Sequence, residues 1–250
     1  MNWTEKHIAN HLEAAKILHK IMQESFEFIS KNRNASEFDV QKFILKKFKE
    51  NKIKSKMGLP IVAFNENSAL PHYQPTKKSK KIKPETFILI DIWGRLEKKS
   101  SPYADITWVA YYGASVPKQI KEVFTLALES RDRAISVIKS NLNNEVLPTG
   151  KEIHEKVSEL IVTEGYKENI LHGTGHTIGF RSPHGKGNDV HLNKKGQRVI
   201  QTNIGYAIEP GIYLKDEFGI RSEINCYIDK NKNLHITTKL QKEMIFLKPL

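Results

Sequence analysis

The sequence predicts an α+β fold built from two similar halves, and three observations lead to this prediction. Amphipathic segments with helical spacing precede each of two groups of apolar strands. Each group holds two acids that are 14 residues apart, Asp91 with Asp105 and Glu209 with Glu223. No change of composition marks a linker within the 250 residues. We therefore expect one domain over residues 1–250, without a separate N-terminal domain.

The composition, 39% hydrophobic and 27% charged, is ordinary for a soluble globular protein. The single cysteine, Cys226, excludes an internal disulfide and fits a reducing compartment. The N-terminus lacks the apolar segment of a signal peptide. No apolar run approaches the ~18 residues that cross a bilayer. We expect a cytoplasmic protein without a membrane partner.

The formal net charge of +12 raises the question of nucleic-acid binding. The lysines are spread along the chain, and the densest group is short. It comprises Lys77, Lys78, Lys80, Lys81 and Lys83. No zinc-finger spacing or aromatic RNA-binding signature accompanies this group. We interpret it as a solvated loop, and nucleic acid is disfavoured as a partner.

The first part of the chain predicts two helices. Residues 4–30 place apolar side chains at helical spacing, and Ser36 with Asp39 marks the start of a second helix. His7 and His11 are four residues apart in the first helix. The glutamate of a metal-binding H-E-x-x-H motif is missing there, so we interpret both as surface histidines.

Apolar runs then predict strands over 59–64, 86–93 and 104–111, with the lysine loop before the second of them. Asp91 interrupts the second run and Asp105 the third. A buried carboxylate is costly unless it is paired or bound to a cation, so both acids are candidate functional residues.

The second half repeats this order. Pro117 predicts the start of a long helix to about residue 140, and Thr149 with Glu152 forms a capping box for the next helix. Apolar strands are expected over 204–213, which holds Glu209, and over 219–227, which holds Glu223. Residues 234–238 and 243–247 are expected to be closing strands.

Between these helices and strands lies the stretch Leu-His-Gly-Thr-Gly-His-Thr-Ile-Gly-Phe, residues 171–180. Its glycines argue against a helix, and their spacing does not match a dinucleotide-binding loop. It contains His172 and His176, and the loop after it contains His184. Imidazoles beside such a backbone suit a metal ion or a reacting carbonyl group.

The repeated spacing of the acids predicts a metal site. If each acid pair lies on a hairpin, each hairpin points two carboxylates at one face. Four carboxylates in a shared pocket cannot all remain ionised without cations. With His176 the donor set has many oxygens and one nitrogen, which suits Mn²⁺, Fe²⁺, Co²⁺ or Zn²⁺. A lone buried acid would more often be salt-bridged, but duplicated positions favour one or two metal ions.

These residues resemble the pita-bread metallopeptidases, which include methionine aminopeptidase, aminopeptidase P, prolidase and creatinase. The resemblance covers about residues 8–248. It implies a fold of two pseudo-symmetric α/β halves around a curved antiparallel sheet with helices on its outer side. It also implies two divalent ions, with Mn²⁺ as the first choice. The implied metal ligands are Asp91, Asp105, His176, Glu209 and Glu223.

Three features resemble the proline-specific branch: His172 four residues before His176, Arg221 two before Glu223, and Leu-Pro-His-Tyr over 70–73. The resemblance implies an Xaa-Pro aminopeptidase or dipeptidase that acts on peptides. An open site would favour the aminopeptidase. Alternatives are a methionine aminopeptidase-type enzyme, a creatinase-like C–N hydrolase, or a non-catalytic protein that binds proteins or nucleic acid. The oligomeric state is open, and a homodimer is one option.

The resemblance also implies roles for individual residues. Glu209 transfers the proton, His184 with help from His172 stabilises the oxyanion, and His72 positions the substrate. Arg221 either orients Glu223 and its neighbours or forms a structural ion pair. Tyr73 and Trp108 are candidates for an apolar wall against the prolyl ring, although ordinary core packing is the more common role for each. Trp108 replaces a usual arginine, and residues 94–102 contain a small insertion.

Overall fold

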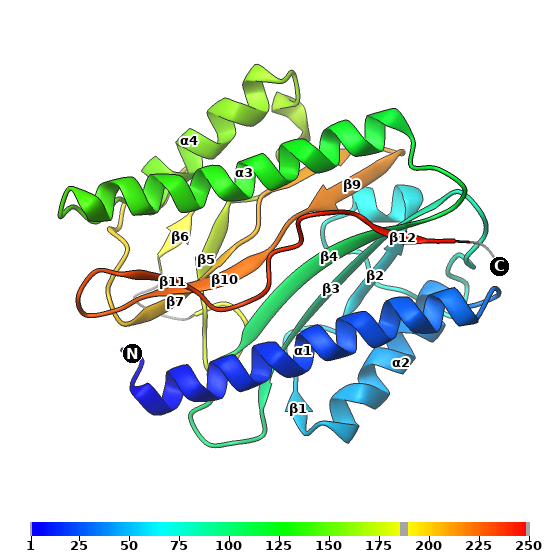
Figure 1. Ribbon diagram of the computed structural model, residues 1–250, viewed down its shortest axis with the longest axis horizontal. Coiled ribbons are helices and arrows are strands. Elements are labelled where there is room, and N and C mark those ends of the chain that lie inside the picture. The colour runs from blue at the N-terminus through cyan, green and yellow to red at the C-terminus, as the bar shows by residue number, and fades with distance from the viewer. Residues whose placement is uncertain (1, 186–189, 249–250) are drawn as a thin grey trace.

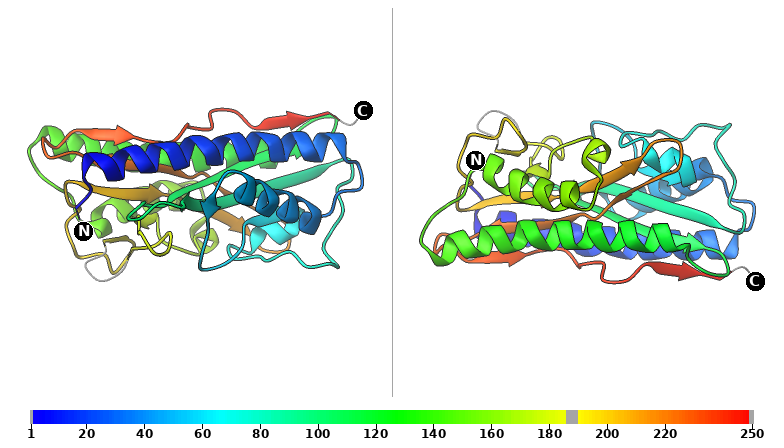
Figure 2. Two further views of the ribbon diagram at one scale, coloured as in Figure 1. Left: turned by 90° about the horizontal axis from the view of Figure 1, so that it is seen from below. Right: turned by 90° about the horizontal axis from the view of Figure 1, so that it is seen from above.

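In the computed structural model, which describes residues 2–185 and 190–248, strands lie in the middle of the molecule between two pairs of helices. Helices α1 (Glu5–Lys31) and α2 (Glu37–Glu50) lie on one side, and α3 (Lys118–Asn143) and α4 (Gly150–Thr163) on the other (Figure 1). The two long helices, α1 and α3, run along the length of the molecule (Figure 2). No helix within the described ranges is long and apolar enough to cross a membrane.

The predicted helix starts are confirmed by their side-chain caps. Thr4, Ser36 and Thr149 each accept a hydrogen bond from the backbone three residues later, and each forms a full capping box. Pro117 precedes the first turn of α3, as predicted. These local signals depend on neighbouring residues alone, which is why the sequence is sufficient to place them.

The first half forms a five-stranded sheet. Its strands are β1 (Ile53–Lys54), β2 (Ile61–Phe64), β3 (Thr86–Leu96), β4 (Ala104–Tyr112) and β12 (Ile245–Leu247). The order is β1-β3-β4-β12, and β2 also pairs with β3. All pairs are antiparallel except β12 with β4, which is parallel because the end of the chain returns alongside β4. The predicted hairpin of the two aspartate strands is confirmed.

The second half forms another five-stranded sheet and a short ribbon. The sheet contains β5 (Gly175–Thr177), β6 (His191–Leu192), β7 (Ile204–Ile208), β10 (Ile224–Ile228) and β11 (Leu234–Ile236). Its order is β11-β10-β7-β5-β6, and every pair is antiparallel. The ribbon pairs β8 (Gly211–Leu214) with β9 (Phe218–Arg221). Short 3₁₀ helices span Asn65–Ala69 (η1) and Lys167–Asn169 (η2).

The two glutamates do not lie within continuous strands, and here the prediction is wrong. The expected strand 204–213 divides into β7 and β8, and 219–227 divides into β9 and β10. Glu209 and Glu223 lie in the two interruptions. Pro210 has no N–H to continue the ladder, and the Glu209 N–H instead donates to the Thr174 carbonyl at 2.8 Å. Both glutamates therefore lie outside the regular strand pairing.

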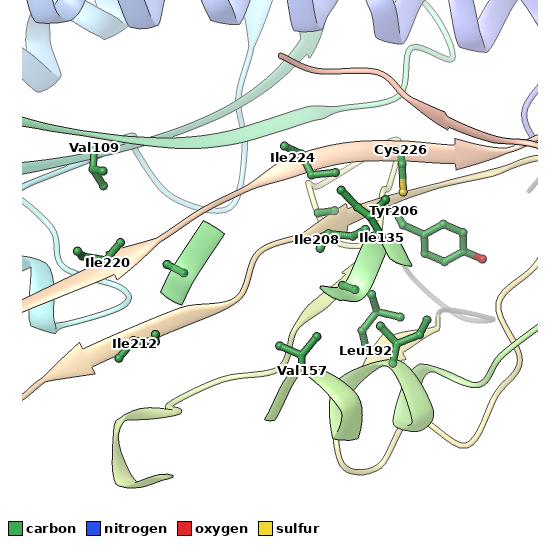
Figure 3. Packing of buried hydrophobic residues seen from close by; sticks show 14 of the residues in the cluster. Val109, Ile135, Val157, Leu192, Tyr206, Ile208, Ile212, Ile220, Ile224 and Cys226 are labelled. Carbon is green, nitrogen blue, oxygen red and sulfur yellow. The ribbon is translucent and has the colours of Figure 1, made fainter. Parts of the chain in front are cut away.

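Strand β3 is buried on both faces, which explains its unbroken apolar run. Ile88, Ile90 and Ile92 pack toward α1 and α2, whereas Phe87 and Leu89 pack toward the second half. In the second half, Ile135 of α3 and Val157 of α4 cover the strand residues Ile208 and Ile224 (Figure 3). The β3–β4 hairpin thus separates two apolar clusters.

This alternation shows that Trp108 cannot form a wall of a site beside Asp105. Asp105, Thr107 and Val109 share one face of β4, and Trp108 lies on the other. Its ring contacts His19 of α1 at a centroid distance of 5.3 Å. Trp108 therefore belongs to the packing against α1, which confirms the core role that the sequence analysis favoured for it and excludes the substrate wall.

His11 corrects a second prediction, because it is fully buried and not on the surface. Its Nδ1 lies 2.7 Å from the Tyr103 carbonyl and its Nε2 lies 2.7 Å from Thr237 Oγ1. Burial lowers the pKa of His11 to about 4, so the ring is neutral. His11 fastens α1 to two distant segments. The lysine loop is mostly exposed, and Lys80 within it pairs with Glu66.

Candidate metal centre

A cavity of about 400 Å³ is lined by residues from both halves of the molecule. Nine of the predicted site residues line it: Asp91, Asp105, His176, Glu209, Glu223, His72, His172, His184 and Arg221. These side chains are separated by up to 151 positions in the sequence, from residue 72 to residue 223. The fold therefore brings together the carboxylates and imidazoles that the sequence singled out.

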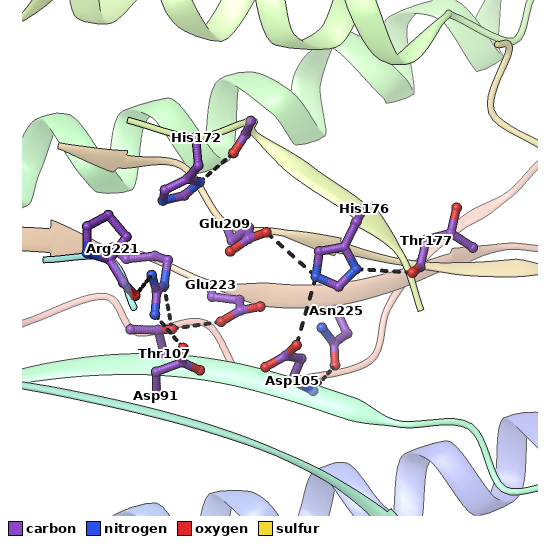
Figure 4. Close-up of polar contacts among 12 residues, drawn as sticks. Asp91, Asp105, Thr107, His172, His176, Thr177, Glu209, Arg221, Glu223 and Asn225 are labelled. Carbon is purple, nitrogen blue, oxygen red and sulfur yellow. Dashed lines mark hydrogen bonds and ion pairs between the residues drawn. The ribbon is translucent and has the colours of Figure 1, made fainter. Parts of the chain in front are cut away.

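Hairpin geometry aims the two aspartates at this cavity. Asp91 is opposite Thr107 and Trp93 is opposite Asp105 in the antiparallel β3–β4 pair. Asp91 and Trp93 are two apart on one strand, so the two aspartates point to the same face. Glu209 and Glu223 reach the cavity from the second half of the molecule. Glu209 lies at the break between β7 and β8, and Glu223 lies at the break between β9 and β10. Figure 4 shows the four carboxylates converging between β4 and the strands of the second half.

His176 lies against these carboxylates. Its Nε2 is 3.6 Å from Glu209 Oε1 and 3.9 Å from Asp105 Oδ2. Its Nδ1 lies 3.0 Å from the Thr177 carbonyl, which fixes the proton on Nδ1 and leaves the Nε2 lone pair directed at the acids (Figure 4). One ligand atom each of Asp105, His176 and Glu223 lies within 4.8 Å of the others.

The electrostatics of the carboxylates favour a cation. Burial raises the pKa values of Asp105 and Glu223 well above their usual range, and the neighbouring acids add to both shifts. Burial raises the pKa of Glu209 to about 7 and also raises the pKa of Asp91, which Arg221 partly offsets. The single positive charge of Arg221 cannot keep all four acids ionised at neutral pH, and a divalent ion would supply further positive charge.

The histidine is in the form that can bind a metal ion. Burial, with a smaller contribution from the neighbouring His184, lowers the pKa of His176 to about 3. The imidazole is therefore neutral at physiological pH, with one nitrogen lone pair available.

Two buried carboxylate oxygens among the described residues accept no hydrogen bond. Among the described residues, no hydrogen-bond donor reaches Asp91 Oδ1 or Glu223 Oε1, although both atoms are buried. Leaving a buried acceptor unpaired is costly. An oxygen-rich set with one imidazole matches the preference of hard to borderline divalent ions. The residues present thus fit a metal centre.

Arg221 supports this set of acids mainly through Asp91. Its Nη2 forms an ion pair with Asp91 Oδ2, and its Nε donates to Thr107 Oγ1 at 3.0 Å. Thr107 donates in turn to Glu223 Oε2 at 2.7 Å. Arg221 therefore reaches Glu223 through a hydroxyl group and contacts Asp91 directly. The sequence analysis did not single out Thr107, although it lies on the same strand face as Asp105.

His172 is held by its neighbours and does not offer a proton to the cavity. Its Nδ1 lies 2.7 Å from the Gly173 carbonyl, so that nitrogen holds the proton. Its Nε2 accepts from the Tyr213 hydroxyl at 2.7 Å, and Tyr213 accepts from Arg221 Nη1 at 3.0 Å. Burial lowers the pKa of His172 to about 3, so no second proton is present. This arrangement differs from the predicted help of His172 at an oxyanion, and Tyr213 was not predicted.

His184 and His72 lie at the cavity wall, as predicted. The His184 ring stacks on His176 at a centroid distance of 4.0 Å and an interplanar angle of 9°. His72 follows Pro71, whose carbonyl oxygen lies 3.4 Å from Arg221 Nη1. Both imidazoles therefore stand beside the acids from loops that the sequence alone could not place.

Tyr73, by contrast, is not part of the cavity lining that the structure describes. Its hydroxyl donates to Glu37 Oε2 at 2.7 Å. The prediction of a substrate contact at Tyr73 is therefore wrong, because a buried carboxylate on α2 holds the side chain. Glu37 also accepts hydrogen bonds from Phe64 N at 2.6 Å, Asn67 Nδ2 at 2.9 Å and Lys80 N at 3.1 Å. It thereby fastens the segment that contains His72.

We expect Glu37→Ala to lower the free energy of unfolding by about 3 kcal/mol, because several buried donors would lose their acceptor. Urea unfolding followed by circular dichroism measures this loss. Glu97→Ala is the control, since Glu97 forms an exposed ion pair with Lys54 at 2.7 Å. It should leave the free energy of unfolding nearly unchanged, because exposed ion pairs contribute little to stability. Equal losses in the two variants would contradict the anchoring role of Glu37.

The four acids and the histidine define a divalent-metal site of the kind found in metallohydrolases. Residues 9–230 match metallopeptidase family M24, and the chain belongs to this family. The fold is the pita-bread fold that the sequence predicted.

The following three relatives are similar to this protein over nearly its whole length. An Xaa-Pro dipeptidase of Pyrococcus horikoshii is 27% identical over 246 residues, which cover 97% of this chain and 64% of the relative. The structure of an X-Pro aminopeptidase from Thermotoga maritima has a TM-score of 0.83 and 25% identity, covering 98% of this chain and 64% of that one. An Xaa-Pro dipeptidase from Bacillus anthracis gives a TM-score of 0.82, 26% identity, and coverage of 98% and 64%. The chain thus spans less than two thirds of the length of these relatives.

Proposed function

We propose that this chain is a metal-dependent peptidase that hydrolyses the peptide bond between an N-terminal residue and proline. One observation supports this most: four buried carboxylates and a neutral imidazole converge on one cavity, and two carboxylate oxygens there lack a hydrogen-bond donor among the described residues. Asp91, Asp105, His176, Glu209 and Glu223 would hold two divalent ions. Mn²⁺ is the first choice, with Co²⁺, Zn²⁺ and Fe²⁺ as alternatives.

Bound ions of this kind lower the pKa of a coordinated water and polarise a carbonyl group. The residues of the chain divide the remaining work. Glu209 lines the cavity and keeps 19% of its side chain exposed, so it is our candidate to accept the proton of the attacking water and to return it to the leaving nitrogen. His184 donates to the carbonyl oxygen as negative charge develops. Arg221 holds Asp91 in place by its direct ion pair.

The names of the relatives, Xaa-Pro dipeptidase and X-Pro aminopeptidase, support proline as the residue after the scissile bond. A prolyl bond has no N–H, so the site must hold this substrate by its carbonyl group and by contacts with the ring. We propose His184 for the contact with the carbonyl group. His72, on the wall beside Arg221, is the contact we propose for the substrate backbone.

We expect faster turnover of Ala-Pro-Ala and Ala-Pro than of Met-Ala-Ser, by about tenfold or more in kcat/KM under the same metal loading. The ratio of the two prolyl substrates separates an aminopeptidase from a dipeptidase, and we expect Ala-Pro-Ala to be preferred. Should Met-Ala-Ser be the best substrate, the enzyme is of the methionine aminopeptidase type. Should none be cleaved by protein that holds its metal, the fold serves a binding function.

A further inference from the structure

One side of the cavity differs in chemistry from the rest. Titratable side chains gather around the metal site, whereas Met57, Ile61 and Trp93 add apolar side chains to the lining, and Ile61 and Trp93 share the strand face of Asp91. Neither the metal site nor the proposed proton transfers use these three residues. An apolar surface next to a reaction centre is a typical place for a substrate side chain.

Trp93 is fixed beside the proposed metal ligands. It lies opposite Asp105 in the β3–β4 hairpin and two residues after Asp91, so its side chain shares their face. Its Nε1 donates to the Lys56 carbonyl at 3.0 Å, and the residue is 7% exposed. A Cβ atom added at Gly58 would lie 3.2 Å from Trp93 Cζ2, so this backbone packs directly on the indole. The indole is a rigid wall.

Met57 forms the rim of the same wall. Met57 and Gly58 both have positive φ values, 65° and 118°, which turn the backbone sharply between Lys56 and Leu59. Met57 lines the cavity and yet is 73% exposed, whereas Ile61 beneath it is 5% exposed. A substrate side chain that covers Met57 would remove this apolar surface from water.

We propose that Trp93 and Met57 form the subsite for the side chain of the substrate residue that precedes proline, and that this subsite selects apolar residues. The inference rests on the proposed function. The prolyl ring is common to all such substrates, so a rigid site suffices for it. The preceding residue varies, and a flexible thioether on the rim adapts to different apolar shapes. The wall offers no charge, so acidic or basic side chains would lose their hydration there without compensation.

The test compares kcat/KM of Mn²⁺-loaded protein on Leu-Pro-Ala, Gly-Pro-Ala, Glu-Pro-Ala and Lys-Pro-Ala. We expect Leu-Pro-Ala to exceed Gly-Pro-Ala by about tenfold or more, and both charged peptides to be the poorest. Trp93→Ala and Met57→Ser should each reduce the ratio of leucine to glycine by several-fold. Met57→Leu should keep it. Met57 is exposed, so its variants test the wall even if Trp93→Ala fails to fold.

Trp108→Ala is the matched control, because Trp108 follows Asp105 closely but lies on the opposite face of β4 against α1. Its ratio of leucine to glycine should match the wild type. A wild-type ratio near one, or an unchanged ratio in Met57→Ser, would overturn the proposal.

Equilibrium binding separates failure of the wall from failure of the proposed function. If no peptide is cleaved, the proposed function fails, and the dissociation constants of leucinamide and glycinamide for the Mn²⁺-loaded protein decide about the wall. Tighter binding of leucinamide that is lost in Met57→Ser would support the apolar subsite. Equal affinities for the two amides would exclude it.

Discussion

Asp105→Ala is expected to lose most of its bound metal and to lower peptidase activity by at least about 10²-fold. Loss of a residue that merely supports a metal ligand typically costs 10–100-fold in affinity or activity, and Asp105 is proposed as a ligand. Its Oδ2 lies 3.9 Å from His176 Nε2, and the buried carboxylate is close enough to the other three acids for their charges to raise its pKa. Removing it leaves one buried negative charge fewer to hold two cations.

Elemental analysis of the desalted protein after Mn²⁺ loading provides the measurement, and the wild type should approach two ions per chain. Asp132→Ala is the control, because Asp132 is an aspartate on α3 whose side chain is 57% exposed. It should retain the wild-type metal content and activity. A metal content in Asp105→Ala equal to that of the control would refute the assignment of the site.

Local signals in the sequence were sufficient for the helices and for the aspartate hairpin. Capping residues act within one turn, and strands β3 and β4 are joined by a short connection, so the register of Asp91 and Asp105 follows from neighbouring residues. The alternation of β4 also determines the direction of Trp108, since an odd spacing from Asp105 places it on the other face.

The rest of the site depends on partners distant in the sequence. Tyr73 is held by Glu37, 36 residues away, and Tyr213 of the β8–β9 ribbon donates to His172, 41 residues away. No local pattern predicts such pairs. The interruption at Glu209 has a local cause in Pro210, but the acceptor of its N–H is the Thr174 carbonyl of another segment. Tertiary contacts therefore decide which polar residues face the cavity and which support them.

The His172 network changes the expectation for the oxyanion. His172 donates to a backbone carbonyl and accepts from Tyr213, so of the two histidines we propose His184 as the one that stabilises the developing charge. His184 lines the cavity, and its ring lies parallel to that of His176. A donor in this position would act on the carbonyl oxygen without itself holding metal.

His184→Ala is therefore expected to lower kcat by roughly 10²-fold, as for removal of an oxyanion donor, with a smaller change in KM. Metal content should stay near that of the wild type, because the proposed ligand is His176, whose Nε2 faces the acids. His235→Ala is the matched control: His235 pairs with Asp229 at 2.8 Å, is 43% exposed and lies outside the cavity lining. Its kcat should be unchanged.

If His184→Ala instead lost metal in proportion to activity, the stacked histidine would be a ligand, and the oxyanion would need another donor. Retained metal with a selective loss of kcat would assign His184 to the transition state, where its contact with the carbonyl oxygen strengthens as charge develops.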